Sequence, residues 1–323
     1  MRISASLLDL ALHCLCTQKG VRPLFLCVGL VSAFPVTAPA QTFGGIGTRA
    51  EGMGGAFIAV ADDASAVYWN PAGIATGATF DLQVSAAKGA TIFVGAALPV
   101  LGLSYYRTHQ DTASPTVSPP VDRQNGGSGE VRVRPLTTTN VGVTVVQTVV
   151  SGLVIAATTR LVRGGVETRD ARTTVDFDAG AMVSAWDIRF GLTARNLREP
   201  EFEGESGPLT MKRQFRVGAA LVPRSLPTGV HGPFSVAIDA DLTTTPGPFG
   251  DRRGAALGGE YWLAQGLVGV RGGVRWSTLG DLNRAFSGGF TVRLPRSVYA
   301  EGQMTKGEEV DEEQWNIGVR VTF

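Results

Sequence analysis

The sequence predicts an all-β fold: an antiparallel transmembrane β-barrel of about 14 strands, with an N-terminal hatch (plug) segment in the lumen. Three observations predict it. Apolar and polar residues alternate along many segments, the segments are long, and the connections between them alternate between short and long. Alternation gives each strand one apolar and one polar face, and strands of about nine to eleven residues cross a bilayer when tilted.

The clearest alternation lies at the end of the chain, in EQWNIGVRVTF at residues 313–323. The same period of two recurs at 173–185, 186–196, 267–277 and 284–294. A soluble sandwich would alternate as well, with its apolar face against a second sheet, and this alternative stays open. Strand length favours the barrel, because soluble strands more often run about five or six residues. In the last segment, the apolar parity holds Trp315, Ile317, Val319, Val321 and Phe323.

The strands are expected in order along residues 79–323. We predict them at 79–87, 91–98, 101–108, 136–148, 151–163, 173–185, 186–196, 210–222, 233–243, 254–264, 267–277, 284–294, 297–305 and 313–323. A closed sheet leaves no open row of backbone amides, which lipid could not satisfy.

The predicted connections also fit a membrane barrel, in which short turns lie on one side and long loops on the other. The longest loop is expected at 109–135. Two connections depart from the pattern, since 88–90 is short where a loop is expected and 223–232 is long where a turn is expected. Short turns are predicted at 98–100, 149–150, 185–186, 265–266 and 295–296.

Residues 1–40 have the pattern of an export signal that is removed from the mature protein. Lys19 and Arg22 supply a positive flank, residues 23–36 an apolar core, and the small residues 38–40 a cleavage site before Gln41. A start at Val21 would give a signal of more ordinary length. We therefore expect the mature protein outside the cytoplasm.

The cysteines raise one alternative, a lipoprotein acylated at Cys27. That chemistry needs a small residue before the cysteine, and Leu26 stands there instead. Cys14 and Cys16 also lie in the predicted signal, so the mature chain would have neither a disulfide nor a thiolate nucleophile.

Composition narrows the function classes. The formal net charge is +1, which gives none of the basic field that nucleic-acid binding needs. Glycine is abundant, with 42 residues, and charged residues make up only 18%, which favours β-structure with tight turns. After the signal, no run reaches the ~18 continuous apolar residues of a membrane-spanning helix.

Residues 41–78 precede the first clear strand and form the predicted hatch. Asp62 and Asp63 are placed to cap a short helix over 64–69, and Pro71 biases Asn70 away from helix and ends it. A phosphate-binding loop would need a preceding strand and a Lys at fixed spacing, and neither is present. We expect such a compact, irregular, partly apolar segment to be buried in the barrel lumen. Its motif residues are Gly52, Gly54, Gly55, Asp62, Asp63, Asn70 and Pro71.

Residues 47–75, GTRAEGMGGAFIAVADDASAVYWNPAGIA, resemble the N-terminal signature of the FadL superfamily of outer-membrane proteins, most closely its PorV/PorQ-like branch. The resemblance implies a hatch that plugs a 14-stranded barrel, with Asn70-Pro71-Ala72 matching a recurrent element. It also implies the bacterial outer membrane and assembly by the barrel-insertion machinery, which the terminal Phe323 suits.

The predicted lumen carries charged residues, which we expect to form cross-strand pairs and hold the hatch. The alternative is that excess arginine draws an anionic head group through the barrel. The possible lumen-facing residues are Asp176, Asp178, Arg189, Arg195, Glu260, Arg271, Arg275, Arg293, Glu301 and Arg320.

An enzyme is not expected, and neither is a cofactor or a metal site. A hydrolase normally needs a histidine near carboxylates. The predicted topology puts His109 at the start of the long loop and His231 at the opposite end of the barrel, so the two would not share a site.

Two functions remain. The first is passive transport of a hydrophobic or amphipathic small molecule across the outer membrane, with the hatch as gate, which predicts an apolar cavity between hatch and wall. The second, a PorV-like role as an outer-membrane partner of exported proteins, predicts a filled lumen and a docking surface on the loops.

Overall fold

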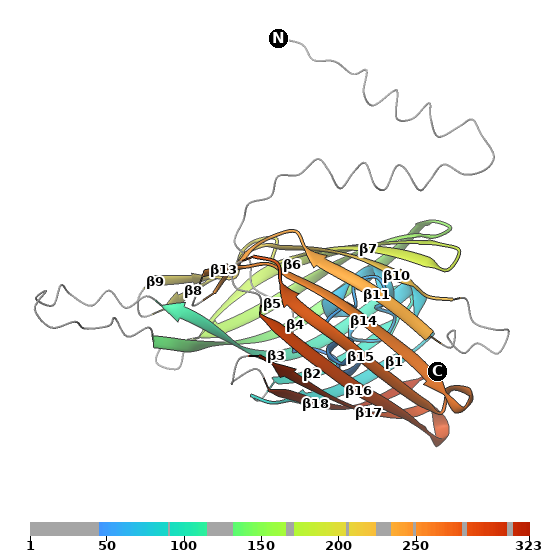
Figure 1. The fold of residues 1–323 in the computed structure, drawn as a ribbon. Coiled ribbons are helices and arrows are strands. Elements are labelled where there is room, and N and C mark those ends of the chain that lie inside the picture. Colours follow the sequence, from blue (N-terminus) through green and yellow to red (C-terminus); the bar gives the residue numbers. More distant parts are fainter. Residues whose placement is uncertain are drawn as a thin grey trace, which may run out of the picture. The chain divides into compact units, whose positions relative to one another are not determined.

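The computed structural model describes residues 45–89, 91–114, 132–165, 171–204, 207–223, 234–247, 250–279, 283–308 and 313–323. Within these residues, 14 strands form one closed antiparallel barrel in the order β1-β18-β17-β16-β15-β14-β11-β10-β7-β6-β5-β4-β3-β2. Each strand pairs with its neighbours in the chain, and β18 pairs with β1 to close the sheet. The predicted fold class is confirmed (Figure 1).

The element bounds follow the predicted segments closely. The strands of the barrel are β1 (Asp81–Ala87), β2 (Thr91–Leu98), β3 (Leu101–Ser114), β4 (Arg132–Val150), β5 (Leu153–Gly165), β6 (Arg172–Ala185), β7 (Ile188–Arg195), β10 (Gln214–Leu221), β11 (Phe234–Asp241), β14 (Gly254–Leu263), β15 (Val268–Ser277), β16 (Arg284–Leu294), β17 (Val298–Gly307) and β18 (Gln314–Thr322).

The prediction of a loop over 109–135 is wrong at both of its ends. β3 continues to Ser114 and β4 begins at Arg132, and the two strands pair from His109↔Thr137 to Ser114↔Arg132. The extension could not be recognised from the polar, proline-containing sequence. Outside the apolar belt of a barrel, a paired strand does not need an apolar residue at every second position. The remainder of the predicted loop lies outside the described residues.

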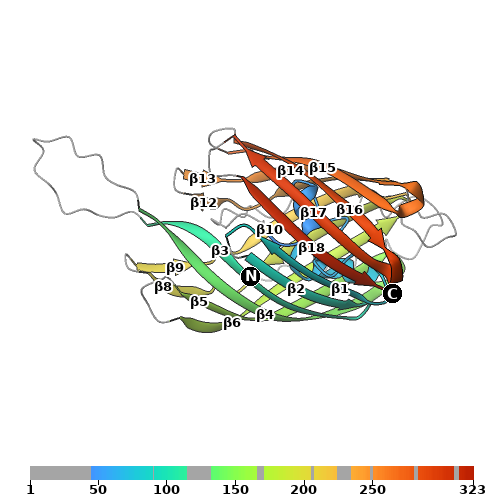
Figure 2. The same cartoon turned by 90° about the horizontal axis from the view of Figure 1, so that it is seen from below.

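Two small hairpins were not predicted. They are β8 (Glu201–Gly204) with β9 (Gly207–Thr210), and β12 (Thr245–Gly247) with β13 (Gly250–Arg252). Both lie at the end of the barrel opposite the C-terminus (Figures 1 and 2). We call this end the loop end.

The other end, here called the turn end, carries the short connections and joins the first and last strands. The backbones of Phe80 and Phe323 exchange two hydrogen bonds, 3.1 and 2.9 Å long, and their rings stack at 6.1 Å. The two predicted exceptions remain. β1 and β2 are separated only by 88–90 at the loop end, while β10 and β11 are separated by 222–233 at the turn end.

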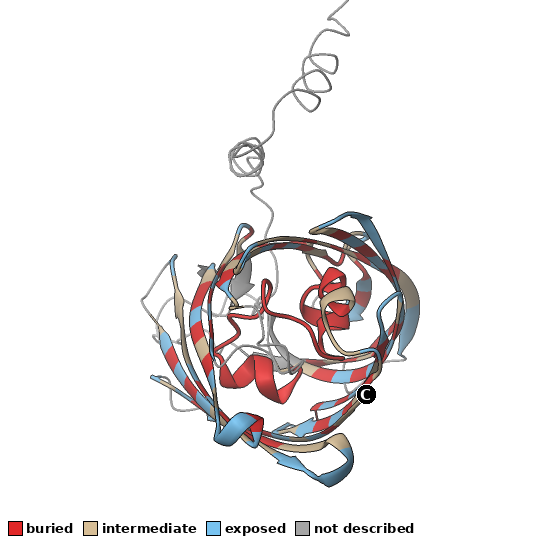
Figure 3. Cartoon of the chain, turned by 90° about the vertical axis from the view of Figure 1, so that its right-hand side faces the viewer, coloured by how far each residue is buried: buried red, intermediate tan, exposed pale blue. Residues whose placement is uncertain are grey.

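Burial alternates along the strands, with period two, as the sequence pattern requires. In β5, the side chains from Val154 to Gly164 alternate between buried and exposed. Around the barrel, buried and exposed positions alternate in the same way (Figure 3). The outer face exposes large apolar side chains on strand after strand, among them Leu103, Val141, Ile155, Leu192, Ile238, Leu257, Phe286, Phe290, Ile317 and Val319.

Residues 46–74 are buried inside the barrel, and the segment 45–80 is called the hatch below (Figure 3). The segment contains α3 (Thr48–Gly52), α4 (Ala66–Trp69) and the 3-10 helix η1 (Pro71–Thr76). Its apolar side chains make most of the main buried cluster of the protein, including Phe57, Ile58, Val67, Trp69 and Ile74. Two short 3-10 helices, η2 (Ala264–Gly266) and η3 (Pro295–Ser297), lie between strands of the barrel. Among the described residues, no helix has the length and apolarity to span a membrane.

The predicted export signal, its cleavage site and the three cysteines lie outside the described residues.

Candidate functional site: the hatch and its seat

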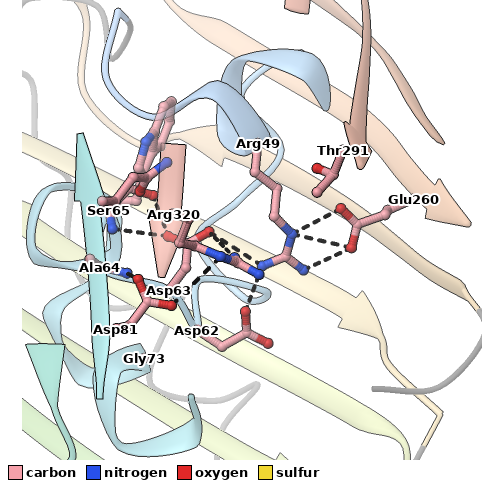
Figure 4. Close-up of polar contacts among 12 residues, drawn as sticks. Arg49, Asp62, Asp63, Ala64, Ser65, Gly73, Asp81, Glu260, Thr291 and Arg320 are labelled. Carbon is pink, nitrogen blue, oxygen red and sulfur yellow. Dashed lines mark hydrogen bonds and ion pairs between the residues drawn. The ribbon is translucent and has the colours of Figure 1, made fainter. Parts of the chain in front are cut away.

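Arg49 of α3 is the centre of an ion-pair network between the hatch and the wall (Figure 4). Its Nε donates to Glu260 of β14 at 3.0 Å, and its Nη1 lies 2.5 Å from Asp62 and 3.5 Å from Asp63. Glu260 is shared with Arg271 of β15 at 3.4 Å. Burial opposes ionisation of Arg49, but the carboxylates of Asp62 and Glu260 outweigh it and hold its pKa well above the ordinary value.

Asp63 ties the same network to the seam where the barrel closes. Its Oδ2 lies 3.5 Å from Arg320 of β18, and Arg320 also reaches Asp81 of β1 at 3.7 Å. The other oxygen of Asp63 accepts hydrogen bonds from the amide and hydroxyl of Ser65 (Figure 4). Asp63 therefore stabilises the turn before α4. The predicted capping is wrong, because α4 begins at Ala66, its N-cap is Ser65 and no side chain caps it, while Asp62 pairs with Arg49 instead.

Asp239 of β11 holds the opposite side of the hatch through its backbone. Its Oδ2 accepts hydrogen bonds from the amides of Phe57, at 2.6 Å, and Ile58, at 2.8 Å. Arg216 of β10 lies 3.8 Å from this carboxylate and donates to the carbonyl oxygen of Gly55 at 3.2 Å. Neither Asp239 nor Arg216 was predicted as a lumen-facing residue from the sequence, although both lie at inward-facing positions of their strands.

Asn70 fastens the end of α4 to the wall. It has extended backbone, with φ −151° and ψ 101°, so the helix stops there as predicted. Its side-chain amide donates to the carbonyl oxygens of Ile58 (2.9 Å) and Ala181 of β6 (3.1 Å), and its oxygen accepts from the amide of Ala72. Pro71 lies against Gly180 of β6.

Glycines in the wall make room for the hatch. A Cβ added at Gly258 or Gly273 would overlap the carbonyl oxygen of Met53, and these two glycines pair directly across β14 and β15. Gly191 and Gly218 pair in the same way across β7 and β10, beside Ile58. The sequence signal for these contacts is glycine at an inward-facing strand position. The wall glycines in contact with the hatch are Gly95, Gly102, Gly180, Gly191, Gly218, Gly258, Gly273 and Gly318.

The motif glycines of the hatch have distinct places. Gly54 (φ +69°) and Gly55 (φ +81°) have left-handed backbone that glycine adopts without strain, which lets the chain turn sharply after α3. Gly54 also lies against the backbone of Val274, and Gly52 against the side chain of Arg271. These glycines shape the contact between hatch and wall and offer no catalytic group.

The ten possible lumen-facing residues divide into three groups. Arg189 and Arg275 lie partly buried against the hatch, 3.6 Å from Asp62 and Glu51 respectively. Arg293 faces the lumen side of β16 but is exposed near the turn end, with its guanidinium 6.0 Å from the ring of Tyr299. The remaining seven are buried: Asp176, Asp178, Arg195, Glu260, Arg271, Glu301 and Arg320.

A second network lies in the wall toward the loop end and centres on Arg160 of β5. Its guanidinium is 2.5 Å from Asp176 and 2.7 Å from Asp178, and it donates to Tyr106 and Asn140. Arg160 was not predicted as a site residue, although it shares the inner parity of its strand.

A small polar cavity lies beside this network. Its volume is about 10 Å³, room for about one water molecule. It is lined by Tyr68, Tyr106, Thr108, Thr138, Asn140, Arg160, Arg195, Asn196, Met211 and Gln214. Its lining is mostly polar, unlike the apolar passage that a simple transport channel would show.

The structure corrects the prediction that His109 opens a loop. His109 lies in β3, where its Nδ1 hydrogen-bonds the hydroxyl of Thr137 at 2.8 Å, because the strand pairing extends past it. His231 lies outside the described residues. Among the described residues, no group of three or more His, Cys, Asp or Glu side chains is arranged to hold a metal ion.

Comparison with solved structures finds FadL-like barrels. The "CymD monoaromatic hydrocarbon channel" matches with a TM-score of 0.60 and 13% identity, over 88% of this chain and 99% of that one. A Pseudomonas aeruginosa FadL homologue matches with 0.59 and 12%, over 89% and 99%. The P. putida toluene transporter TodX matches with 0.57 and 12%, over 86% and 99%. At this identity the likeness concerns the fold, which is FadL-like.

The sequence comparisons are less informative. A profile of the family described as "F plasmid transfer operon, TraF, protein" matches residues 164–241, which is less than half of the chain. No curated protein sequence matches.

Proposed function

We propose that the protein is an outer-membrane β-barrel that passes a hydrophobic or amphipathic small molecule passively, with the hatch as its gate and no enzymatic activity. One observation carries the proposal: a FadL-like barrel encloses a hatch that is attached to the wall by ion pairs in addition to apolar contacts. The apolar outer face suits lipid as the surrounding medium. The similar solved structures include a monoaromatic hydrocarbon channel and a toluene transporter.

Ion pairs are suited to a contact that opens. The charged groups at the edge of the hatch recover hydration when water enters, so separating them costs less than separating an apolar interface of the same area. Arg275 already reaches solvent, with 28% of its side chain exposed, while its partner Glu51 is 2% exposed. Opening would begin on this side of the hatch.

In this proposal the described conformation is the closed one. The cavity beside the hatch holds about one water molecule, and the gate opens when the hatch shifts or leaves its seat.

A disulfide between hatch and wall tests the gate directly. A Cβ added at Gly318 of β18 would lie 2.7 Å from the Oγ1 of Thr48, so cysteines at these adjoining positions are placed to form a disulfide after a small shift. We expect the Thr48→Cys/Gly318→Cys variant in liposomes to pass toluene under reducing conditions and to lose most of that flux when oxidised.

The matched control is a disulfide within the wall. The hydroxyls of Ser287 and Thr305, on β16 and β17, are 2.7 Å apart, and Ser287→Cys/Thr305→Cys joins two wall strands to each other and not to the hatch. Its oxidation should leave the flux unchanged. Equal flux through the oxidised and reduced hatch variants would contradict the gate.

The filled lumen favours a second function, the non-enzymatic partner of exported proteins. If neither form of the hatch variant passes any hydrophobic solute, the hatch is a permanent seal and the loop end becomes the working surface. That result would support the PorV-like role over transport.

A further inference from the structure

The loop end of the lumen has its own apolar closure, separate from the hatch. Phe202 of β8 and Met211 pack on Leu136 of β4 and Val162 of β5, with Leu209 at the edge. Phe202 is 1% exposed and Leu136 and Val162 are fully buried. These wall residues lie on the inner face of the barrel, so the hairpin turns its apolar side chains inward.

Phe202 occupies a specific seat. A Cβ added at Gly164 of β5 would lie 2.6 Å from the Cε1 of the Phe202 ring, so the ring stands directly on glycine backbone.

Asn196 joins this hairpin to the wall. Its backbone is left-handed (φ 53°), where the chain leaves β7. The side-chain nitrogen donates to the carbonyl oxygen of Lys212 at 3.0 Å, on the returning leg, and the side-chain oxygen accepts from Arg160 at 2.8 Å. The legs also meet where the Met211 amide donates to the Pro200 carbonyl at 2.8 Å. Asn196 and the contact between the two legs therefore attach residues 197–204 and 207–213 to the wall, and we call these residues the outer lid.

The polar cavity lies between the two closures. Met211 of the outer lid and Tyr68 of the hatch both line it. A solute that enters from the loop end meets the seat of Phe202 first, then this cavity, then the hatch.

We propose that the outer lid is a second gate. In the closed lid, Phe202 occupies the site that the solute binds, and a hydrophobic molecule with a single ring or a short chain displaces Phe202 from its seat on Gly164. This proposal rests on the proposed transport function for its solute. The lid itself is tested without measuring transport.

Cysteine labelling reports whether the outer lid is open. Thr138 is fully buried and lines the cavity beneath the lid, and the predicted mature chain has no cysteine of its own. In the Thr138→Cys protein in liposomes, we expect slow reaction with a membrane-impermeant thiol reagent. Adding Phe202→Ala should raise the rate at least about tenfold, because loss of a buried aromatic ring exceeds the energy of a tenfold change.

Glu201→Ala is the matched control, since Glu201 is the exposed neighbour of Phe202 on the same strand, and it should leave the rate unchanged. Equal rates for the two alanine variants would overturn the lid. Refilling the seat by adding Gly164→Leu to Phe202→Ala should lower the rate again.

The displacement of Phe202 by a solute has its own measurement. Toluene should accelerate labelling of Thr138→Cys while Phe202 is present, and have little effect once Phe202 is alanine. A cysteine at the buried Ser235, at the turn end of β11, should not respond to toluene. If toluene leaves the Thr138→Cys rate unchanged, the proposed displacement of Phe202 is wrong, and the transport function is still judged by the flux of the hatch variant.

Discussion

Asp239 shows how a single wall residue positions the hatch. Both amides that it accepts from, those of Phe57 and Ile58, are buried, and without the carboxylate they would have no partner of comparable strength. Leaving buried donors unsatisfied costs about 1–3 kcal/mol for each group.

We therefore predict that Asp239→Ala lowers the free energy of unfolding by about 2–6 kcal/mol. Hydrogen exchange at the amides of Phe57 and Ile58 should accelerate before global unfolding. Asp239→Asn keeps one acceptor oxygen and should show a smaller effect. Unchanged exchange at both amides in the alanine variant would mean that the carboxylate does not hold the hatch.

The wall glycines allow a comparison between neighbouring residues. Gly273 faces the lumen against Met53, whereas Gly272 faces outward, where the nearest atom to an added Cβ is the carbonyl oxygen of Ser287 at 3.7 Å. Gly273→Ala forces the hatch out of place and should destabilise the protein by about 1–3 kcal/mol, the usual range for overpacking.

Gly272→Ala should stay within about 0.5 kcal/mol of the natural protein, as expected for an outward position without close contacts. Thermal unfolding in detergent measures both. Equal destabilisation by the two substitutions would show that the effect comes from strand propensity and not from the contact between Gly273 and the hatch.

At the scale of elements, the strands were the predictable part. Alternation is a property of each strand alone, so β2 and β16 match their predicted bounds of 91–98 and 284–294. The extensions of β3 and β4 were missed, since those residues pair where no apolar parity marks them. The hairpin β8–β9 was missed for another reason: its four-residue strands are too short to show a period.

The hatch was predictable as a segment but not in its contacts. Its glycines and the Asn70-Pro71 stop are local signals, which the sequence displays. The partners of Arg49, Asp62 and Asp63 come from strands far along the chain, so their identity depends on the register of a closed barrel. For the same reason, the sequence does not indicate which part of the hatch backbone packs against each inward-facing glycine.

The α3 helix also carries a pH-dependent contact. Burial raises the pKa of Glu51 above its ordinary value of 4.5, although Arg275 and the amide of Gly45 act in the opposite direction. From pH 4.5 up to the raised pKa, the folded protein holds a proton that the unfolded chain has lost, so the stability that Glu51 contributes falls as pH rises through this range.

Glu51→Gln should remove this decline, so the stability of the variant relative to the natural protein increases with pH across the same range. Thermal unfolding over a pH series is the measurement. Arg275→Gln should extend the decline to higher pH, because it removes the attraction that favours the carboxylate. A constant difference between Glu51→Gln and the natural protein at all pH values would contradict the raised pKa.

At the scale of the whole molecule, one arrangement underlies the account: the apolar side chains of the strands face lipid tails while the hatch fills the lumen. Two tryptophans separate these environments. Trp315 of β18 is 47% exposed on the outer face, and Trp69 of the hatch is fully buried.

Quenching by lipids with brominated acyl chains distinguishes the two environments in variants that keep only one tryptophan, with the others replaced by phenylalanine. The account predicts strong quenching of Trp315 and little quenching of Trp69. Equal quenching of both, or none of Trp315, would contradict a barrel that stands in lipid around an enclosed hatch.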